Sequence, residues 1–376
     1  MILVIADDIT GAAEIAGIAH RQGLSVSFSL ASDESLEDNN CDVLVIATDT
    51  RSEDEETARQ IIRDIISHLT TSPQLLYKKV DSALRGHIIA EMTELMRNLG
   101  MRYALLIPQN PALGRTIEGG TYLIDGTPLH QTAFRYDPEY PVQTADVTEI
   151  LSPANHLTIG DPLVKGINIA DGKDEEEVIR QLEKHTRGVL LAGGGFAFDC
   201  LLRQMDHNKE TIPYTLPPNK HTKTIVVCGS TQSKEIHHLP FFLQHDTTVI
   251  SMPENVFHGE DPTTWMEKST NDYLHHEVTI LRIGHEAVTT KEYATRLKET
   301  MALLTTQMIS EETPYQLIIE GGATAYCILQ SLGWHHYAIK KEIAPGVVCM
   351  TYHDATSSVD IILKPGSYPW GNLFEQ

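Results

Sequence analysis

The chain has 376 residues and a formal net charge of −22, and 41% of its residues are hydrophobic. This length is typical of two domains that each bury a core, and the strong negative charge argues against a nucleic acid or an acidic membrane surface as partner. The apolar runs are too short to span a membrane, and five cysteines without a C-x-x-C pair indicate reduced thiols. We therefore expect a cytoplasmic protein.

The first predicted strand, residues 2–6, runs directly into two acidic residues at the start of a helix. Asp7 and Asp8 follow the strand, and residues 10–12, Thr-Gly-Ala, are typical of a helix N-terminus. In open α/β sheets, ligands bind beyond the carboxyl ends of the strands, where acidic side chains can hold a polyol, a metal or an attacking hydroxyl group. Because one acid suffices for capping, we interpret Asp7 mainly as the helix cap and Asp8 as the functional acid.

Polar and charged residues also follow the next three predicted strands. Arg51 comes after the strand at residues 43–48, a polar group begins at the end of strand 75–80, and strand 104–107 ends in a Pro-Gln-Asn-Pro turn. A helix with one apolar face is predicted over residues 58–69, and this alternation indicates a parallel sheet whose strand ends meet at one edge. The residues expected at that edge are Asp7, Asp8, Arg51, Lys79, Asp81, Ser82 and Arg85.

These side chains suit a ligand that carries both hydroxyl groups and a carboxylate. Asp8 and Asp81 are candidate proton acceptors for a reacting hydroxyl group, and Arg51 and Arg85 are candidate partners for a carboxylate, which an arginine can bind through two N–H donors. The sequence does not choose within either pair. A helix cap is the alternative interpretation of Asp81, and a surface ion pair is the alternative for each arginine.

Two further segments of the first half have open interpretations. Residues 108–142 are rich in turns and contain a predicted hairpin strand at residues 121–124, which suits either a lid or a homodimer contact. Residues 190–197, Leu-Leu-Ala-Gly-Gly-Gly-Phe-Ala, resemble part of a dinucleotide-binding turn, but the full G-x-G-x-x-G is missing. We interpret this stretch as a tight turn.

The predicted domain boundary is the segment 213–223, which has three prolines and no hydrophobic periodicity. Further strands are predicted at residues 224–228, 248–252, 278–283, 316–319, 347–352 and 359–363, and a helix at residues 292–308. We therefore expect an α/β protein of two domains, residues 1–215 and 222–376, with mainly parallel sheets and a cleft between the domains.

Three turns in the second half suit the phosphates of a nucleotide. Each follows a predicted strand, and glycines there allow a close approach of the backbone, while a following helix offers free N–H groups. No P-loop motif occurs. Three pairs of adjacent histidines are interpreted as solvated, since neighbouring residues do not share a face, and no metal ligand is assigned. The candidate nucleotide-binding residues are Ser230, Gly321, Gly322, Ala323, Thr324 and Gly366.

The motifs of the first half resemble those of the four-carbon acid sugar kinases. The opening D-D-I-T-G-A stands at residues 7–12, T-R at residues 50–51, K-V-D-S-A-L-R-G at residues 79–86, and a P-x-x-G-R-T stretch that ends in D-P at residues 111–138. In the second half, G-G-A-T, E-x-x-P-G and a K-x-G region match more loosely at residues 321–324, 342–346 and 364–371.

The resemblance implies an N-terminal domain that binds a threonate, erythronate or 3-oxo-tetronate type of acid and a C-terminal domain that binds ATP, with Mg²⁺ as the usual companion of phosphoryl transfer. It implies sugar-acid contacts from Asp8, Arg51, Lys79, Asp81 and Ser82, and nucleotide contacts from the six residues named above.

Two alternatives stay open at this point. One is a hydroxy-acid dehydrogenase that uses NAD through residues 190–197. The other is a catalytically weak family member with a regulatory role, because Ala323 replaces an acid of the family pattern and Glu235 replaces a hydroxyl residue.

Overall fold

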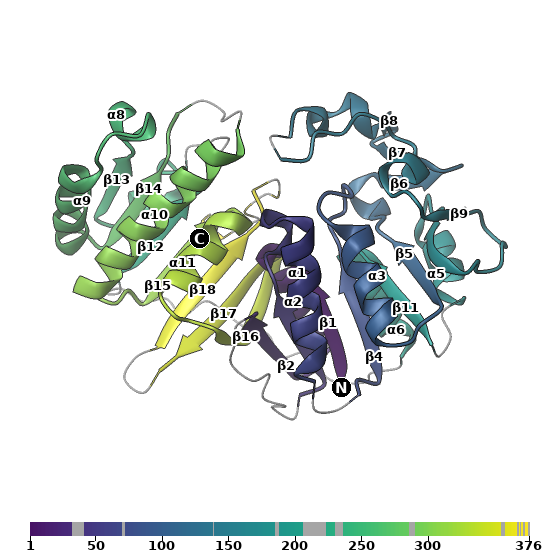
Figure 1. The fold of residues 1–376 in the computed structure, drawn as a ribbon. Helices are drawn as coiled ribbons and strands as arrows, with labels where there is room; N and C mark the ends of the chain where they lie inside the picture. The colour runs from purple at the N-terminus through teal and green to yellow at the C-terminus, as the bar shows by residue number, and fades with distance from the viewer. Residues whose placement is uncertain are drawn as a thin grey trace. The chain divides into compact units, whose positions relative to one another are not determined.

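The computed structural model describes residues 1–31, 41–69, 72–137, 139–184, 188–205, 223–229, 236–285, 290–354, 358–366, 368, 370 and 373–374. The chain divides into two compact units, Met1–Thr211 (unit 1) and Ile212–Gln376 (unit 2). The predicted linker at residues 213–223 lies outside the described residues except for Lys223. Both units are α/β, as expected (Figure 1).

Unit 1 contains a parallel sheet with the strand order β2-β3-β1-β4-β11-β5-β10-β9. Its strands are β1 (Ile2–Ala6), β2 (Val26–Leu30), β3 (Val43–Ala47), β4 (Leu75–Lys79), β5 (Tyr103–Ile107), β9 (Asn155–Leu157), β10 (Gly166–Ala170) and β11 (Val189–Gly193). Its helices are α1 (Ile9–Arg21), α2 (Glu55–Ser67), α3 (Ile88–Asn98), α4 (Val147–Ile150), α5 (Glu175–Leu182) and α6 (Gly195–Gln204).

The sheet of unit 1 is covered by helices that pack in two groups, with α2 beside α3 in one and α6 between α1 and α5 in the other. Side chains alternate along each strand, so Leu3, Ile5 and Leu76 share a hydrophobic cluster with Ile62 of α2 and Met92 of α3. Because both of their faces are buried, β1 and β3 are continuous apolar runs, and polar residues begin where each of them ends.

The turn-rich segment belongs to the packed core of unit 1. It forms a small antiparallel sheet of β6 (Arg115–Glu118), β7 (Thr121–Ile124) and β8 (Thr127–Pro128), followed by short 3-10 turns. Ile117, Tyr122 and Leu129 of this segment are fully buried in the same cluster as the main sheet. The hairpin at residues 121–124 was predicted from the two glycine turns that flank it, whereas its attachment to the sheet edge was not.

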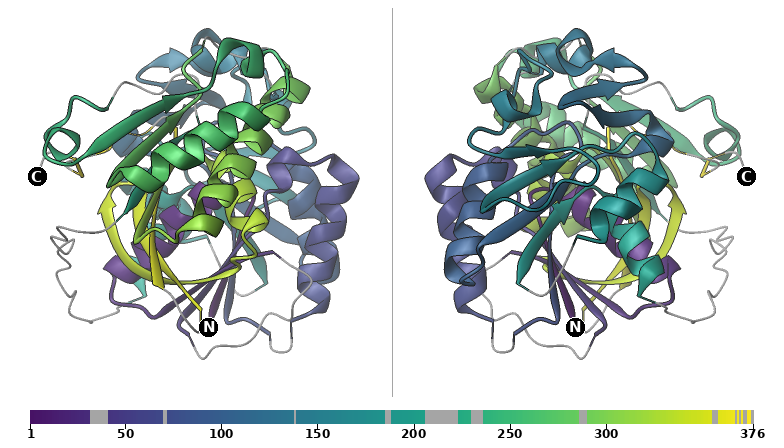
Figure 2. Two further views of the ribbon diagram at one scale, coloured as in Figure 1. Left: turned by 90° about the vertical axis from the view of Figure 1, so that its left-hand side faces the viewer. Right: turned by 90° about the vertical axis from the view of Figure 1, so that its right-hand side faces the viewer.

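Unit 2 has the strand order β13-β14-β12-β15-β18-β17-β16, parallel from β13 to β18 and antiparallel over the last three strands. Its strands are β12 (Thr224–Cys228), β13 (Thr247–Ser251), β14 (Val278–Arg282), β15 (Gln316–Glu320), β16 (His336–Ala344), β17 (Val347–His353) and β18 (Ser358–Lys364). Its helices are α7 (Pro240–Leu243), α8 (Glu254–Phe257), α9 (Thr263–His275), α10 (Lys291–Glu311) and α11 (Gly322–Ser331). Helix α10 packs between α9 and α11 and crosses the parallel strands in the left-hand view of Figure 2.

The tight turn predicted within residues 190–197 is the junction of a strand and a helix. This stretch is the end of β11 and the start of α6, with Gly194 between them as the N-cap. A side chain at Gly193 would meet the carbonyl oxygen of Ile107 at 2.2 Å, so close packing against β5 requires the glycine there. Strands β2, β10 and β16 were also not predicted, since each is short of apolar residues or interrupted by polar ones.

Candidate active site

The predicted acidic and basic residues of unit 1 lie together because their strands are neighbours. Strand β1 pairs with β3 on one side and β4 on the other, all parallel, so the carboxyl ends of the three strands meet at one edge of the sheet. The acids after β1, Arg51 after β3, and the residues after β4 therefore converge. Arg51 follows the left-handed residue Asp49, whose φ of 51° turns the chain towards β1.

Arg51 is the centre of this cluster and contacts three carboxylates. Its Nε and Nη2 atoms lie 2.9 and 2.8 Å from Oδ2 of Asp7, and Nη2 lies 3.1 Å from Oδ1 of Asp8. Its Nη1 atom lies 3.5 Å from Oδ1 of Asp81. The hydroxyl group of Tyr140 donates to the Arg51 carbonyl oxygen over 2.6 Å, which holds the backbone of this residue as well. Arg51 therefore joins acids from β1 and β4.

Asp8, and not Asp7, caps the first helix, so the capping interpretation of Asp7 was wrong. Oδ1 of Asp8 accepts a hydrogen bond from the backbone N–H of Gly11 (3.1 Å), and Oδ2 accepts one from the Thr10 hydroxyl group (2.6 Å). Burial raises the pKa of Asp8, but nearby Arg51 and Lys79 outweigh it and leave the pKa below its usual value. Asp8 is thus both a cap and an ionised group at the site.

Asp7 is directed into the interior instead. Its side chain is 3% exposed, and its Oδ1 atom has no hydrogen-bond partner among the described residues. Burial raises the pKa of Asp7, and the attraction of Arg51 does not fully compensate. Asp7 therefore binds Arg51 from the buried side of the cluster. The alternation of side chains puts it on the same face of the sheet as Ile5, opposite to the face that α1 covers.

Asp81 forms an ion pair with Arg85 in which both carboxylate oxygens take part. Its carboxylate accepts from Nε and Nη2 of Arg85 at 2.8 and 2.9 Å and from the backbone N–H groups of Ala83 and Arg85 at 3.0 and 3.2 Å. Although burial opposes ionisation, Arg85 and Arg51 lower the pKa of Asp81 strongly. Arg85 also donates to Asp137 at 2.8 Å. Both predicted carboxylate-binding arginines therefore already have acidic partners within the chain.

The two adjacent lysines of β4 point to opposite faces of the sheet. Lys79 lies 3.5 Å from Glu14 of α1 and donates to the Val80 carbonyl oxygen at 3.0 Å. Lys78 forms a fully buried ion pair with Glu91 of α3, on the side where Asp7 lies. Both lysines are buried, Lys79 on the side of the sheet that α1 covers and Lys78 on the side that α3 covers.

Ser82 is held by the hairpin of residues 115–124. Nη1 of Arg115 donates to the Ser82 hydroxyl oxygen, and the hydroxyl group of Tyr122 donates to the Ser82 carbonyl oxygen. The sequence analysis did not assign Arg115, Tyr122, Asp137 or Tyr140 to the site. The P-x-x-G-R-T…D-P motif at residues 111–138 could have indicated them. It contains Arg115, Tyr122 and Asp137, and Tyr140 lies two residues after its end.

The candidate nucleotide residues of unit 2 lie at the carboxyl ends of β15 and β18. Gly321 has a φ of 101° and is the N-cap of α11, so no side chain caps the first N–H groups of this helix. Gly322, Ala323 and Thr324 form its first turn. A side chain at Gly229 would meet the Thr324 hydroxyl oxygen at 2.3 Å, so the end of β12 packs closely against the first turn of α11, and the two backbone segments form a cradle between the ends of β12 and β15. Ser230 lies outside the described residues.

A buried ion pair supports this cradle. Nζ of Lys364, at the end of β18, lies 2.6 Å from Oε1 of Glu320 at the end of β15 and donates to the carbonyl oxygens of Pro365 and Gly366 at 3.0 and 3.4 Å. The ring of Trp370 lies 4.9 Å from the same ammonium group. Lys364 therefore fixes the segment that carries Gly366 relative to the start of α11.

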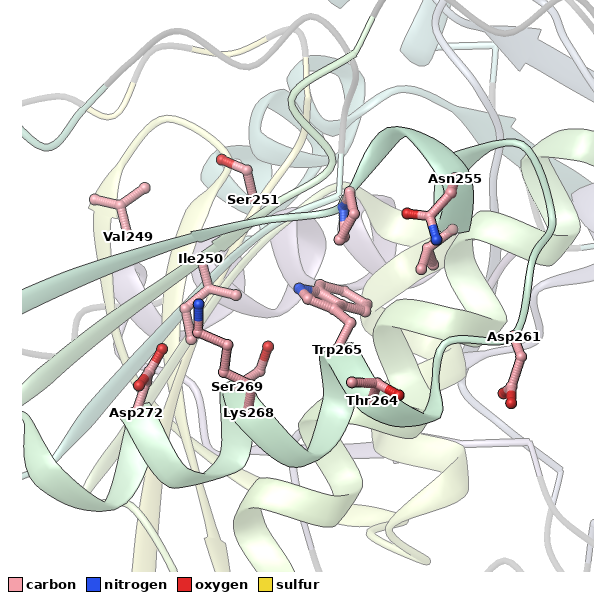
Figure 3. A pocket seen from close by; sticks show the side chains of 12 residues that line it. Val249, Ile250, Ser251, Asn255, Asp261, Thr264, Trp265, Lys268, Ser269 and Asp272 are labelled. Atoms are coloured by element: carbon pink, nitrogen blue, oxygen red, sulfur yellow. The ribbon is translucent and has the colours of Figure 1, made fainter.

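Unit 2 also has a pocket of about 460 Å³ between the edge strand β13 and helix α9 (Figure 3). Ile250 lies on the side of β13 that faces α9, and Trp265, Lys268 and Asp272 follow one side of the helix. None of the residues predicted to bind nucleotide lines it.

Two further features of the described residues concern metal binding and membrane spanning. Within the described ranges, no group of three or more His, Cys, Asp or Glu side chains is arranged to hold a metal ion. No described helix combines the length and the apolar character needed to cross a bilayer.

The family model of a sugar-binding N-terminal domain matches residues 2–194, which is more than half of the chain, and that of a nucleotide-binding C-terminal domain matches residues 253–368. The chain belongs to the four-carbon acid sugar kinase family. The D-threonate kinase of Salmonella typhimurium LT2 is 24% identical over 97% of this chain and 95% of the relative. The D-erythronate kinase of Heliobacterium modesticaldum is 31% identical over 42% of this chain and 37% of the relative.

The fold of the present chain is similar to that of a solved structure. A Salmonella typhimurium LT2 protein, provisionally named a tRNA synthase, superposes with a TM-score of 0.75 over 98% of this chain and 96% of its own. Its identity is 19%, so this likeness concerns the fold alone. The unit 1 cluster lies within the part that the sugar-binding model matches, and the cradle around α11 lies within the part that the nucleotide-binding model matches.

Proposed function

We propose that this protein is an ATP-dependent kinase that phosphorylates a hydroxyl group of a four-carbon sugar acid of the threonate, erythronate or 3-oxo-tetronate type. The observation that carries the proposal is the cluster at the carboxyl ends of β1, β3 and β4, where acids and bases lie within 4 Å of one another in the part of the chain matched by the sugar-binding model. Such a cluster offers both acceptors for hydroxyl groups and donors for a carboxylate.

In this proposal Asp8 orients the reacting hydroxyl group and accepts its proton. Among the described residues, Oδ2 of Asp8 accepts a hydrogen bond from the Thr10 hydroxyl group and keeps a lone pair for a ligand. Oδ2 of Asp81 already accepts three hydrogen bonds, so Asp81 is better suited to a second hydroxyl contact through Oδ1. Because the pKa of both carboxyls is lowered, both are anionic acceptors at neutral pH.

The remaining proposed sugar-acid contacts are Lys79, Ser82, Arg51 and Arg85. In this proposal the buried Lys79 and the half-buried Ser82 supply donors to the ligand. Arg51 and Arg85 hold Asp8 and Asp81 in place, since their guanidinium groups are engaged by these carboxylates at 3.1 and 2.8 Å. Preorganised acids of this kind need not rearrange when the hydroxyl group arrives.

The proposed nucleotide contacts are the backbone groups of Gly321, Gly322, Ala323 and Thr324, together with Gly366 and Ser230. The uncapped first turn of α11 suits phosphate oxygens, and so does the space beside Gly321, where a Cβ atom would come no closer than 3.9 Å to its neighbours. Bound ATP supplies the phosphoryl group, and Mg²⁺ supplies positive charge against its phosphate oxygens. Mg²⁺ in such sites is held mainly by the phosphates and by one or two carboxylates. It therefore needs no separate cluster of protein ligands.

Incubation with ATP and Mg²⁺ and each of D-threonate, D-erythronate and 3-oxo-tetronate tests the proposal, with ADP formation as the readout. We expect turnover with at least one of these acids. Binding of ATP and an acid without turnover would instead favour the regulatory alternative, and reduction of NAD by a hydroxy acid would favour the dehydrogenase. Gly322→Val is the matched variant, because it should abolish ATP binding in calorimetry and leave sugar-acid binding unchanged. The homodimer and the cytoplasmic location remain predictions, and light scattering tests the first.

A further inference from the structure

The substrate carboxylate needs a cation that the protein has not already neutralised. Four cations border the unit 1 cluster: Arg51, Lys79, Arg85 and Arg115. The first three each lie within 4 Å of at least one carboxylate of the chain. Arg115 contacts no carboxylate among the described residues, and its guanidinium group donates to the hydroxyl oxygen of Ser82.

We propose that Arg115, together with the Ser82 hydroxyl group, forms the subsite for the carboxylate of the sugar acid. This inference rests on the proposed function and adds the residue that distinguishes an acid from a neutral sugar. Nothing in the family motifs quoted above assigns that role to Arg115.

The balance of charge supports this subsite. Five carboxyl groups surround the cluster, namely Asp7, Asp8, Glu14, Asp81 and Asp137. Against them stand three paired cations, so the paired groups alone carry an excess of two acids over bases when all are ionised. An anionic ligand would be repelled by such surroundings. Arg115 reduces this excess to one and is the cation of the four that has no carboxylate of the chain beside it among the described residues, so a substrate carboxylate is placed best against its guanidinium group.

The hydrogen-bonding capacity of Arg115 and Ser82 also supports the carboxylate subsite. A guanidinium group has five N–H donors, and Arg115 uses one of them on Ser82. The hydroxyl group of Ser82, which accepts this bond, keeps its own proton to donate. A carboxylate beside them can therefore accept from the remaining edge of Arg115 and from Ser82 at once, in the two-point arrangement that arginine favours.

The backbone places Arg115 firmly. Its N–H and carbonyl groups exchange hydrogen bonds of 3.0 and 2.9 Å with Asn110, which follows the carboxyl end of β5. Ser82 directly follows Asp81, so a four-carbon chain that begins at Ser82 and Arg115 extends its hydroxyl groups towards the carboxylates of Asp81 and Asp8. The subsite thus sets the direction in which the acid lies.

The test compares the wild type with Arg115→Met, Arg115→Lys and Arg135→Met by calorimetry with the sugar acid that the wild type phosphorylates. The exposed Arg135 is the matched control for loss of one positive charge, since its guanidinium group lies over the ring of Tyr136, 6.0 Å from the ring centre. We expect a 10- to 100-fold weaker affinity for Arg115→Met, as for loss of a hydrogen bond to a charged group, an intermediate value for Arg115→Lys, and no change for Arg135→Met.

Two further readouts make the outcomes distinguishable. The sugar alcohol of the same configuration lacks the carboxylate, so its weak binding should be equal in the wild type and Arg115→Met, and the ATP affinity should not change. Wild-type affinity for the acid in a folded Arg115→Met variant, checked by circular dichroism, would overturn the inference alone. A wild type that binds none of the four-carbon acids would overturn the proposed function and this subsite with it.

Discussion

Replacement of Asp81 by asparagine should destabilise unit 1 by about 2–3 kcal/mol. Asparagine retains one carbonyl oxygen, which can still accept from the N–H groups of Ala83 and Arg85. Its amide nitrogen, however, would take the place of Oδ1 and oppose Nη2 of Arg85 at 2.9 Å and Nη1 of Arg51 at 3.5 Å. The variant thus loses a hydrogen bond to a charged group, worth about 1.5–3 kcal/mol, and gains a contact between donors.

The cost stays below the 3–5 kcal/mol typical of a broken buried ion pair because neither arginine is left alone. Arg85 keeps Asp137 at 2.8 Å, and Arg51 keeps Asp7 at 2.8 Å. The side chain of Arg85 is also 26% exposed, so solvent screens part of the loss. For a unit of this size, the expected change corresponds to a fall of roughly 5–10 °C in the midpoint of thermal unfolding.

Far-UV circular dichroism measures this transition, and Asp7→Asn is the matched control. Because burial raises the pKa of Asp7, its ionised form costs free energy in the folded state, and we expect Asp7→Asn to stay within about 1 kcal/mol of the wild type. All three tryptophans, Trp265, Trp334 and Trp370, lie in unit 2, so their fluorescence follows that unit separately. The reasoning is refuted if Asp7→Asn is the more destabilising of the two variants.

The pH dependence gives the sign independently. A carboxyl whose pKa is lowered by folding contributes stability above its unfolded-state pKa of about 4, and this contribution is lost as the pH falls below that value. The difference between wild type and Asp81→Asn should therefore be constant from about pH 6 to 8 and shrink below about pH 4. A difference that grows on acidification would contradict the lowered pKa of Asp81.

Three further variants follow from the same geometry. Asp8→Asn should lower kcat about 10²-fold through loss of the proton acceptor while α1 stays capped, because asparagine caps as well as aspartate; steady-state kinetics with unchanged kcat would remove Asp8 from the reaction. Gly321→Ala should weaken ATP binding in calorimetry, since a φ of 101° strains an alanine at the start of α11, and an unaltered affinity would argue against the cradle. Lys78→Met should cost about 3–5 kcal/mol because it leaves Glu91 charged and buried, whereas Lys78→Met combined with Glu91→Leu should recover most of that loss in urea denaturation; equal stability of the single and double variants would count against this account.

Much of the site could be predicted from local sequence because each strand of a doubly covered sheet is an apolar run that ends abruptly in polar residues. This pattern located Asp7, Asp8, Arg51 and the residues after β4 without any tertiary information. The glycines after β15 could be recognised in the same way, since a left-handed φ at Gly321 requires that residue type. Helix periodicity likewise predicted α2 and most of α10, where residues 292–308 fall within Lys291–Glu311.

Only the tertiary structure decided which of these groups face one another. Asp7 and Asp8 are adjacent in sequence, yet one is directed into the interior and the other to the helix N-terminus, so the capping role expected of Asp7 belongs to Asp8. Arg51 meets acids more than 40 residues away in sequence, and Arg115 meets Ser82 across 33 residues. Contacts of this kind depend on strand order and on the packing of a hairpin into the core of unit 1, which no local pattern of residues encodes.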